Sequence, residues 1–200
     1  MGYQWRYFDI VKKVKEIIQD SQVIMCAGSW LSTLPGGMPW WGRKENSGGQ
    51  IVEQATHMYD LARYLFGEPV SIQAFSNPNF PENDNVDVDC ASSVNMRFAN
   101  GMIANMSCAC ALPVRYKCGF TIFTNKEVIE LVSTKSGMMN VILNIITKAG
   151  AQTIKPERDP VLDVDQTFLA AVQNNDPSAI LCDYSEAVKT LRMTVEASNH

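Results

Sequence analysis

Two carboxylates flank the single internal histidine of this chain at spacings that suit acid–base chemistry. Glu53 precedes His57 by four residues and Asp60 follows it by three, whereas the other histidine, His200, is the last residue. Histidine is the side chain whose ordinary pKa lies nearest neutrality. A carboxylate within reach can fix its tautomer and favour the imidazolium. The stretch therefore predicts a proton carrier, if one element holds these side chains together.

The residues from Gln50 to Phe66 predict one amphipathic helix that would do so. At about 100° per residue, one side of this helix is apolar and carries Val52, Ala55, Tyr59, Ala62 and Phe66. The opposite side carries Glu53, His57, Asp60 and Tyr64, within about 60° of one another. Ser47 and Gln50 fit a capping box at its start, and Gly67 followed by Pro69 predicts its end.

This titratable stripe has two interpretations. One is an ordinary solvated helix face with an internal His–carboxylate contact. The other is a ligand site, because the stripe follows a Gly/Pro-rich loop that carries Trp40, Trp41 and Arg43. The tryptophans can equally form an aromatic plug over the core. Glu53 and His57 could share a metal ion, but one histidine and two carboxylates on one helix converge poorly, so we predict no metal.

Composition describes an ordinary globular protein and excludes several classes of partner. The chain has 200 residues, 46% of them apolar and 19% charged, with a net charge of −4. This charge gives no reason to expect nucleic acid or an anionic membrane, and no run of about 18 apolar residues predicts a transmembrane helix. The six cysteines contain no C-x-x-C, and the N-terminus has no signal-peptide pattern. We therefore expect buried free thiols and a cytoplasmic location.

The order of elements predicts an α+β domain that spans residues 1–200. We expect a helix over 7–20, a strand over 23–32, a long loop, the helix over 50–66, a block of antiparallel strands, and helices over 163–174 and 183–200. The clearest local signal is Asn100-Gly101 between two alternating runs, which predicts a tight hairpin. A second hairpin should turn near Asn125. Strands grouped between helices suggest an open, mainly antiparallel sheet covered by helices on one face.

The uncovered face of that sheet predicts a partner. Several strands carry apolar residues on both faces, for example Ile122 and Phe123. A large apolar sheet face seldom stays exposed on a monomer. We therefore expect a homo-oligomer that forms through the open face.

The stretch "SGGQIVEQATHMYDLARYLFGEPVSIQAF" resembles the signature of the glucose–fructose oxidoreductase/inositol dehydrogenase (Gfo/Idh/MocA) family. The family pattern has two glycines, an acidic residue, a histidine four residues later, an aspartate, and an apolar run ending in glycine. The matching residues are Gly48, Gly49, Glu53, His57, Asp60 and Gly67. The opening "GYQWRYFDIVKKVKEII" and the closing "FLAAVQNNDPSAILCDYSEAVKTLRMTVEAS" are similar to the family's first helical segment and last two helices. The resemblance thus extends along essentially the whole chain.

This resemblance implies the C-terminal domain of an NAD- or NADP-dependent oxidoreductase that acts on a hydroxyl or carbonyl group of a sugar, polyol or related small molecule. The family's N-terminal Rossmann domain has a G-x-G-x-x-G turn and an E-K-P motif, and this sequence has neither. We therefore expect the 200 residues to lack the cofactor domain and to be inactive alone. Two other functions stay open: a non-catalytic small-molecule-binding or assembly module, and a metal hydrolase.

The resemblance also implies roles for individual residues. His57 would exchange a proton with the substrate, and Glu53, which stands where many members have Asp, would orient it. Gln4 and Trp5 would lie at the domain junction beside the nicotinamide. Substrate would contact five further residues: Arg6, Trp40, Trp41, Arg43 and Asp60. Packing and surface ion pairs are the alternative roles for Gln4, Trp5 and Arg6.

Overall fold

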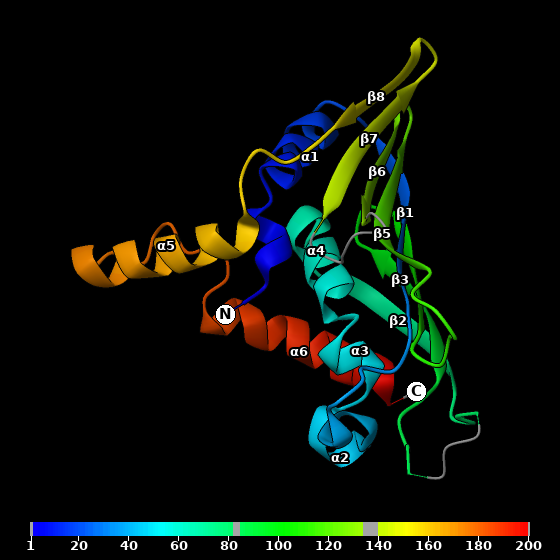
Figure 1. Cartoon of the computed structure of the whole chain (residues 1–200). Helices are drawn as coiled ribbons and strands as arrows, with labels where there is room; N and C mark the ends of the chain where they lie inside the picture. The colour runs from blue at the N-terminus through cyan, green and yellow to red at the C-terminus, as the bar shows by residue number, and fades with distance from the viewer. Residues whose placement is uncertain (1, 82–84, 134–139, 200) are drawn as a thin grey trace.

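The computed structural model describes residues 2–81, 85–133 and 140–199. Its main feature is one open eight-stranded sheet with helices packed on one face, which confirms the α+β prediction (Figure 1). The order is β2-β3-β4-β1-β5-β6-β7-β8. The strands are β1 (Val23–Leu31), β2 (Pro69–Asn77), β3 (Ala91–Phe98), β4 (Ile103–Ala109), β5 (Lys117–Thr124), β6 (Val128–Ser133), β7 (Val141–Thr147) and β8 (Gly150–Ile154).

Strand pairing is antiparallel except between β1 and β4. The β3–β4 hairpin turns at Asn100-Gly101 as predicted. Gly101 has φ of 86°, and the Met102 amide donates to Asn100 Oδ1 at 3.0 Å. The inward side chains of both arms, such as Val94 and Met106, are buried in the core. The hairpin predicted near Asn125 forms between β5 and β6.

Helices α1 (Asp9–Gln19), α4 (Thr56–Phe66) and α6 (Tyr184–Ser198) cover the inner face of the sheet (Figure 1). Their apolar residues join those of the strands in one core cluster. Asp183 caps α6 by accepting from the Glu186 amide at 2.8 Å, as the capping-box pattern predicts. Four short helical elements precede α4 in the sequence: η1 (Gln4–Tyr7), η2 (Pro39–Gly42), α2 (Lys44–Ser47) and α3 (Gln50–Glu53).

The helix predicted over residues 50–66 is interrupted, which corrects the sequence prediction. The amides of Gln54 and Ala55 both donate to the Gln50 carbonyl, at 3.0 and 2.9 Å, so α3 ends and α4 restarts at Thr56. The capping box is also wrong. Gly48 and Gly49 have φ of 75° and 84°, a backbone that turns the chain before α3, and Ser47 Oγ accepts from the Gly49 amide instead.

The outer face of the sheet carries a row of side chains that are polar on every strand except β1, where the residue is Ala27. Cross-strand register aligns one residue from each strand: Gln73, Asn95, Asn105, Ala27, Thr121, Glu130, Asn144 and Thr153. Asn105 donates to Asn95 at 2.9 Å, and Thr153 donates to Asn144 at 2.8 Å. The adjacent row that contains Phe123 is apolar from β4 to β7 and continues to Arg97 on β3, whereas Ile122 is buried in the core. The open face is therefore of mixed character rather than continuously apolar.

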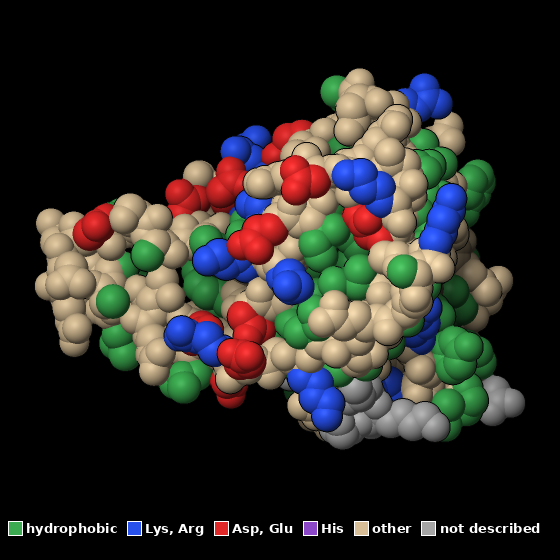
Figure 2. All heavy atoms as spheres, turned by 90° about the horizontal axis from the view of Figure 1, so that it is seen from above, with side chains coloured by type: hydrophobic (Ala, Val, Ile, Leu, Met, Phe, Trp, Pro, Cys, Tyr) green, Lys and Arg blue, Asp and Glu red, His purple; other side chains and the backbone are tan. Residues whose placement is uncertain are grey.

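Helix α5 (Pro160–Asn174) projects away from the sheet and the other helices (Figure 1). Its only buried residue is Pro160. Figure 2 shows apolar side chains along this projecting helix, at the left of the view. The large ones are between 46% and 63% exposed: Val161, Leu162, Phe168, Leu169 and Val172. Apolar surface of this extent on one helix is characteristic of a protein–protein contact.

A buried ion pair fastens η1 to α4. Arg6 donates to both carboxylate oxygens of Asp60, at 2.7 and 2.6 Å, and their side chains are 3% and 0% exposed. Thr190 of α6 donates to Asp60 at 2.8 Å, and Arg6 donates to the Leu181 carbonyl at 2.7 Å. This bidentate geometry satisfies both charges and ties three parts of the chain together.

We predict that Asp60→Ala destabilises the domain by about 3–5 kcal/mol, because Arg6 would stay buried without its counter-charge. Urea denaturation monitored by circular dichroism measures the change. The matched control is Arg158→Met, which removes an ion pair to Asp163 from an arginine that is 63% exposed; it should leave the denaturation midpoint nearly unchanged. Equal effects of the two substitutions would contradict the prediction.

Candidate functional site

The candidate site is a pocket of about 350 Å³ where η1, the end of β1, the loop after β1 and the α3–α4 junction meet. Its lining residues come from sequence positions far apart: Gln4, Trp5, Trp30, Pro35, Met38, Trp41, Glu53, Gln54 and His57. The interruption between α3 and α4 places Gln54 among them. Aromatic walls with a few polar groups are typical of small-molecule sites.

His57 lies between two aromatic rings in this pocket. Trp30 stacks on the imidazole with 5.8 Å between ring centroids and 26° between planes, and Tyr3 meets it edge-on at 6.0 Å. Nδ1 is buried without a hydrogen-bond partner. Loss of hydration lowers the pKa of His57 from 6.5 to about 4, although the negative charge of Asp60 opposes the shift. The imidazole is therefore neutral at neutral pH and has the capacity to accept a proton.

Glu53 also lines the pocket, but it is more exposed than His57. Partial burial raises the pKa of its carboxyl group. No hydrogen bond or ion pair joins the described side chains of Glu53 and His57 in this structure. The orienting role implied for Glu53 therefore stays a prediction.

The structure brings some of the other predicted residues to the pocket and leaves the rest elsewhere. Gln4, Trp5 and Trp41 line it. Trp40 is 45% exposed outside it, and Arg43 forms a surface ion pair with Asp87 at 3.2 Å.

Arg6 and Asp60 are not among the lining residues either, because their charges are paired with each other in the interior. The predicted stripe is corrected here. Asp60 is fully buried rather than on an open helix face, since α4 is packed between the sheet and α6.

The sequence did not predict four of the pocket residues: Pro35 and Met38 of the loop after β1, and Trp30 and Gln54. Trp30 belongs to a strand whose alternation marks it as core, and Gln54 lies between two predicted stripes. Both carry a buried polar atom without a partner, Trp30 Nε1 and Gln54 Oε1, and so do Trp5 at Nε1 and His57 at Nδ1. Buried polar groups are normally paired, so four unpaired ones around one pocket indicate a place for a ligand or water.

The charge of the pocket restricts what it can bind. Glu53 is its one carboxylate, and none of the nine lining residues is Lys or Arg. An anionic ligand would lack a counter-charge here, whereas a hydroxyl group can accept from an indole N–H and donate to an amide or imidazole. The lining also has no glycine-rich loop or cation for the phosphates of a dinucleotide, so these residues do not hold a complete nicotinamide cofactor.

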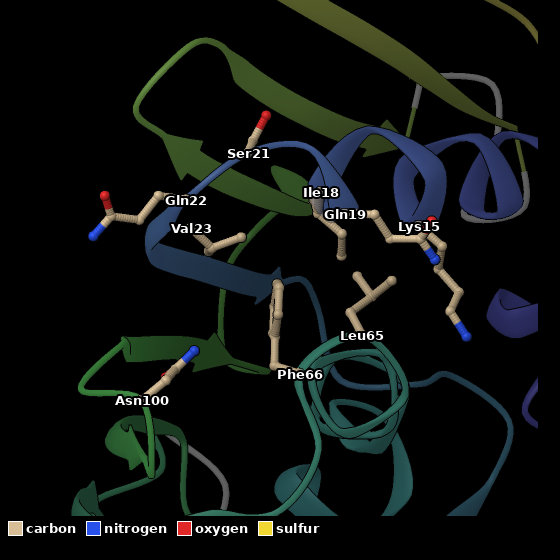
Figure 3. Close-up of a pocket in the computed structure, with 9 residues that line it drawn as sticks. All are labelled: Lys15, Ile18, Gln19, Ser21, Gln22, Val23, Leu65, Phe66 and Asn100. Carbon is tan, nitrogen blue, oxygen red and sulfur yellow. The ribbon is translucent and has the colours of Figure 1, made fainter.

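A larger pocket, of about 530 Å³, lies on the other side of α4 (Figure 3). Figure 3 shows lining side chains from α1, the start of β1, the end of α4 and Asn100 of the hairpin turn. Lys15 is its only charged lining residue, and the Lys15 ammonium lies 4.1 Å from the centroid of the Tyr64 ring. This pocket has no pair of groups for acid–base chemistry.

Three further findings concern metals, thiols and membranes. Within the described residues, no group of three or more His, Cys, Asp or Glu side chains could hold a metal ion. All six cysteines are buried, as predicted, and none of them forms a disulfide bond. No helix in the described part of the chain is long and apolar enough to cross a bilayer.

Comparison with known proteins gives a family match and a shared fold. The family model of the GFO/IDH/MocA C-terminal domain matches residues 11–130, more than half of the chain. An uncharacterized protein of Schizosaccharomyces pombe, C12C2.04, is 23% identical over 224 residues, which cover 100% of this chain and 58% of that protein.

Two solved structures have the same fold. A proposed NADPH-dependent oxidoreductase of Desulfitobacterium hafniense has a TM-score of 0.82 at 16% identity, with 100% of this chain and 61% of that one covered. A levoglucosan dehydrogenase in complex with NADH has a TM-score of 0.79 at 17% identity, with 99% and 63% covered. The chain therefore spans about three fifths of the length of these proteins.

We predict that His57 makes stability depend on pH between about 4 and 6.5. In that window the unfolded chain binds a proton at His57 that the native state does not, so stability falls as pH falls, by about 3 kcal/mol in total. Above pH 6.5 both states are neutral and the contribution is constant. Urea denaturation at a series of pH values, with His57→Gln as the reference, isolates the effect. Parallel profiles for the two proteins would contradict it.

Proposed function

The chain belongs to the GFO/IDH/MocA family as a C-terminal domain, and from this premise we propose that it is the substrate domain of an NAD- or NADP-dependent oxidoreductase. The reaction would take place on a hydroxyl or carbonyl group of a sugar, polyol or related neutral small molecule. The observation that carries the proposal is the neutral, partly buried His57 in an aromatic pocket that contains four unpaired polar atoms.

His57 would serve as the proton acceptor for the reacting hydroxyl. A neutral imidazole has one ring nitrogen without a proton, and that nitrogen would accept the proton of the hydroxyl group. Exclusion of water by Trp30 and Tyr3 keeps the ring neutral before the transfer. Glu53, at the same pocket, would stabilise the imidazolium that forms.

The nicotinamide cofactor would supply the hydride acceptor. This chain would contribute only a surface for it, at Gln4 and Trp5, because the pocket has no phosphate-binding groups. The exposed apolar face of α5 supports the presence of another protein surface in the active assembly. We therefore also propose that a cofactor-binding domain packs against the apolar face of α5.

Two other parts of the proposal concern assembly and location. The polar row and the adjacent apolar row on the open sheet face favour self-association, since amide side chains both donate and accept. A homo-oligomer through this face is therefore proposed. Six buried cysteines without a disulfide bond among them support a cytoplasmic location.

A non-catalytic small-molecule-binding or assembly module is the second candidate function. The pocket and the unpaired polar atoms are equally consistent with binding alone. The two functions differ in what they require of His57, because binding does not need a proton acceptor.

We predict that His57→Ala lowers the turnover of the enzyme that contains this domain and its cofactor domain by about 100-fold or more, because the proton acceptor is lost. Steady-state kinetics with a polyol and NAD(P) measure the change. Tyr116→Ala is the control, because this aromatic side chain is 74% exposed and does not line the pocket, and it should keep near-normal turnover.

Unchanged turnover in His57→Ala would favour the non-catalytic module. The 200-residue chain alone should show no dehydrogenase activity with any polyol and NAD(P), since it cannot hold the hydride acceptor. Turnover by the pure chain would contradict this part of the proposal.

We predict that Asn105→Arg dissociates the oligomer, because it places a charge at the centre of the open sheet face. Light scattering coupled to gel filtration measures the mass of the particle. Lys12→Asp, on the exposed side of α1, alters charge on the opposite layer and should leave the mass unchanged. If the wild-type chain is a monomer in solution, the proposed homo-oligomer is wrong.

A further inference from the structure

Trp30 is fixed in position from three directions. It lies on β1 in register with Cys108 of β4 and Cys118 of β5, and its side chain points to the core and is 3% exposed. Its carbonyl oxygen accepts from Gln50 Nε2 at 3.2 Å, which ties the strand to α3. The indole is therefore a rigid part of the sheet rather than a mobile pocket side chain.

Trp30 contacts His57, and this contact is the one that concerns the site. The two rings lie 26° from parallel with 5.8 Å between centroids, so the indole covers one face of the imidazole. Tyr3 covers an edge at 6.0 Å and is held by a 3.0 Å hydrogen bond to Thr56, the residue before His57. Between them the two aromatic side chains limit the directions from which water can approach the ring.

The charged and titratable groups around His57 do not explain a neutral imidazole. Asp60 on α4 favours the charged ring, and Arg6 from η1 largely neutralises Asp60. Glu53 on α3 would also favour the charged ring, and the Tyr3 phenol is neutral, because burial raises its pKa. On β1 the neighbour is the indole itself, flanked by two thiols. Burial is therefore the effect that works against protonation, and Trp30 and Tyr3 are the two aromatic rings in contact with the imidazole.

We propose that Trp30 is a positioning residue whose stacked indole keeps the His57 ring dehydrated and correctly oriented as a proton acceptor. The inference rests on the proposed function for its purpose, but its test measures titration of His57 rather than turnover. A failure of the proposal for Trp30 can thus be distinguished from a failure of the proposed function. An indole face can also attract an imidazolium. Removal of the indole would then lower the pKa of His57, whereas loss of dehydration would raise it, and the experiment separates the two effects.

The test is a proton NMR titration of the 200-residue chain, which contains only two histidines. His57→Gln identifies the His57 signals. The wild-type ring should titrate at about 4. Trp30→Leu should raise this pKa by about one unit or more, because water reaches the ring, whereas Trp30→Phe should keep it near the wild-type value. Trp40→Leu, at an exposed tryptophan outside the pocket, is the matched control and should change nothing.

A Trp30→Leu pKa equal to or below the wild-type value would overturn the proposal, since covering by the indole would then not oppose protonation. If Trp30→Phe shifted as far as Trp30→Leu, the indole N–H rather than the stacked ring would matter, which also overturns it.

A second measurement does not depend on the folding of Trp30→Leu. Protonation of a stacked histidine should quench indole fluorescence in the wild-type chain with the same midpoint as the NMR titration. Trp30→Phe should lose that quenching step while Trp40→Leu keeps it. Quenching of equal amplitude in Trp30→Phe would show that another tryptophan contacts His57 and would overturn the proposal.

Discussion

The buried ion pair between Arg6 and Asp60 is the contact on which the geometry of the site depends. It joins η1, which supplies Gln4 and Trp5, to α4, which supplies His57 three residues before Asp60. Neither charge could stay in the interior without the other. Two walls of the pocket are therefore held in register by one bidentate contact, and Thr190 extends it to α6.

Two effects act on His57 close to this ion pair: the charge of Asp60 and the loss of hydration on burial. The negative charge of Asp60 is compensated by Arg6, so it does little to stabilise an imidazolium one helical turn away. Loss of hydration on burial then lowers the pKa of His57, and Trp30 and Tyr3 are the aromatic rings that lie against it. A neutral imidazole beside unpaired N–H and C=O groups is suited to a hydroxyl ligand, and the absence of lysine and arginine from the lining disfavours an anion.

Local sequence signals located some features correctly because they depend on neighbours in the chain. The Asn100-Gly101 hairpin follows from backbone preferences of two residues, and the Asp183 cap of α6 follows from a hydrogen bond within one turn. The helix over residues 50–66 was only partly right. The sharing of the Gln50 carbonyl by two amides leaves no periodic trace in the sequence. The wheel placed Asp60 on an open face for a different reason: it cannot show that Arg6 and α6 pack over that face and bury Asp60.

The sequence by itself determined the α+β class, the family resemblance and His57 as the residue of interest, since these depend on residue type, spacing and periodicity. Only the tertiary structure decided which residues accompany His57. Trp30 comes from a strand whose pattern indicates only core, and it reaches the histidine because β1 lies between β4 and β5. Likewise Arg6 meets Asp60 across 54 residues of chain. Such contacts depend on how distant segments pack, and a single sequence does not encode that packing in any local pattern.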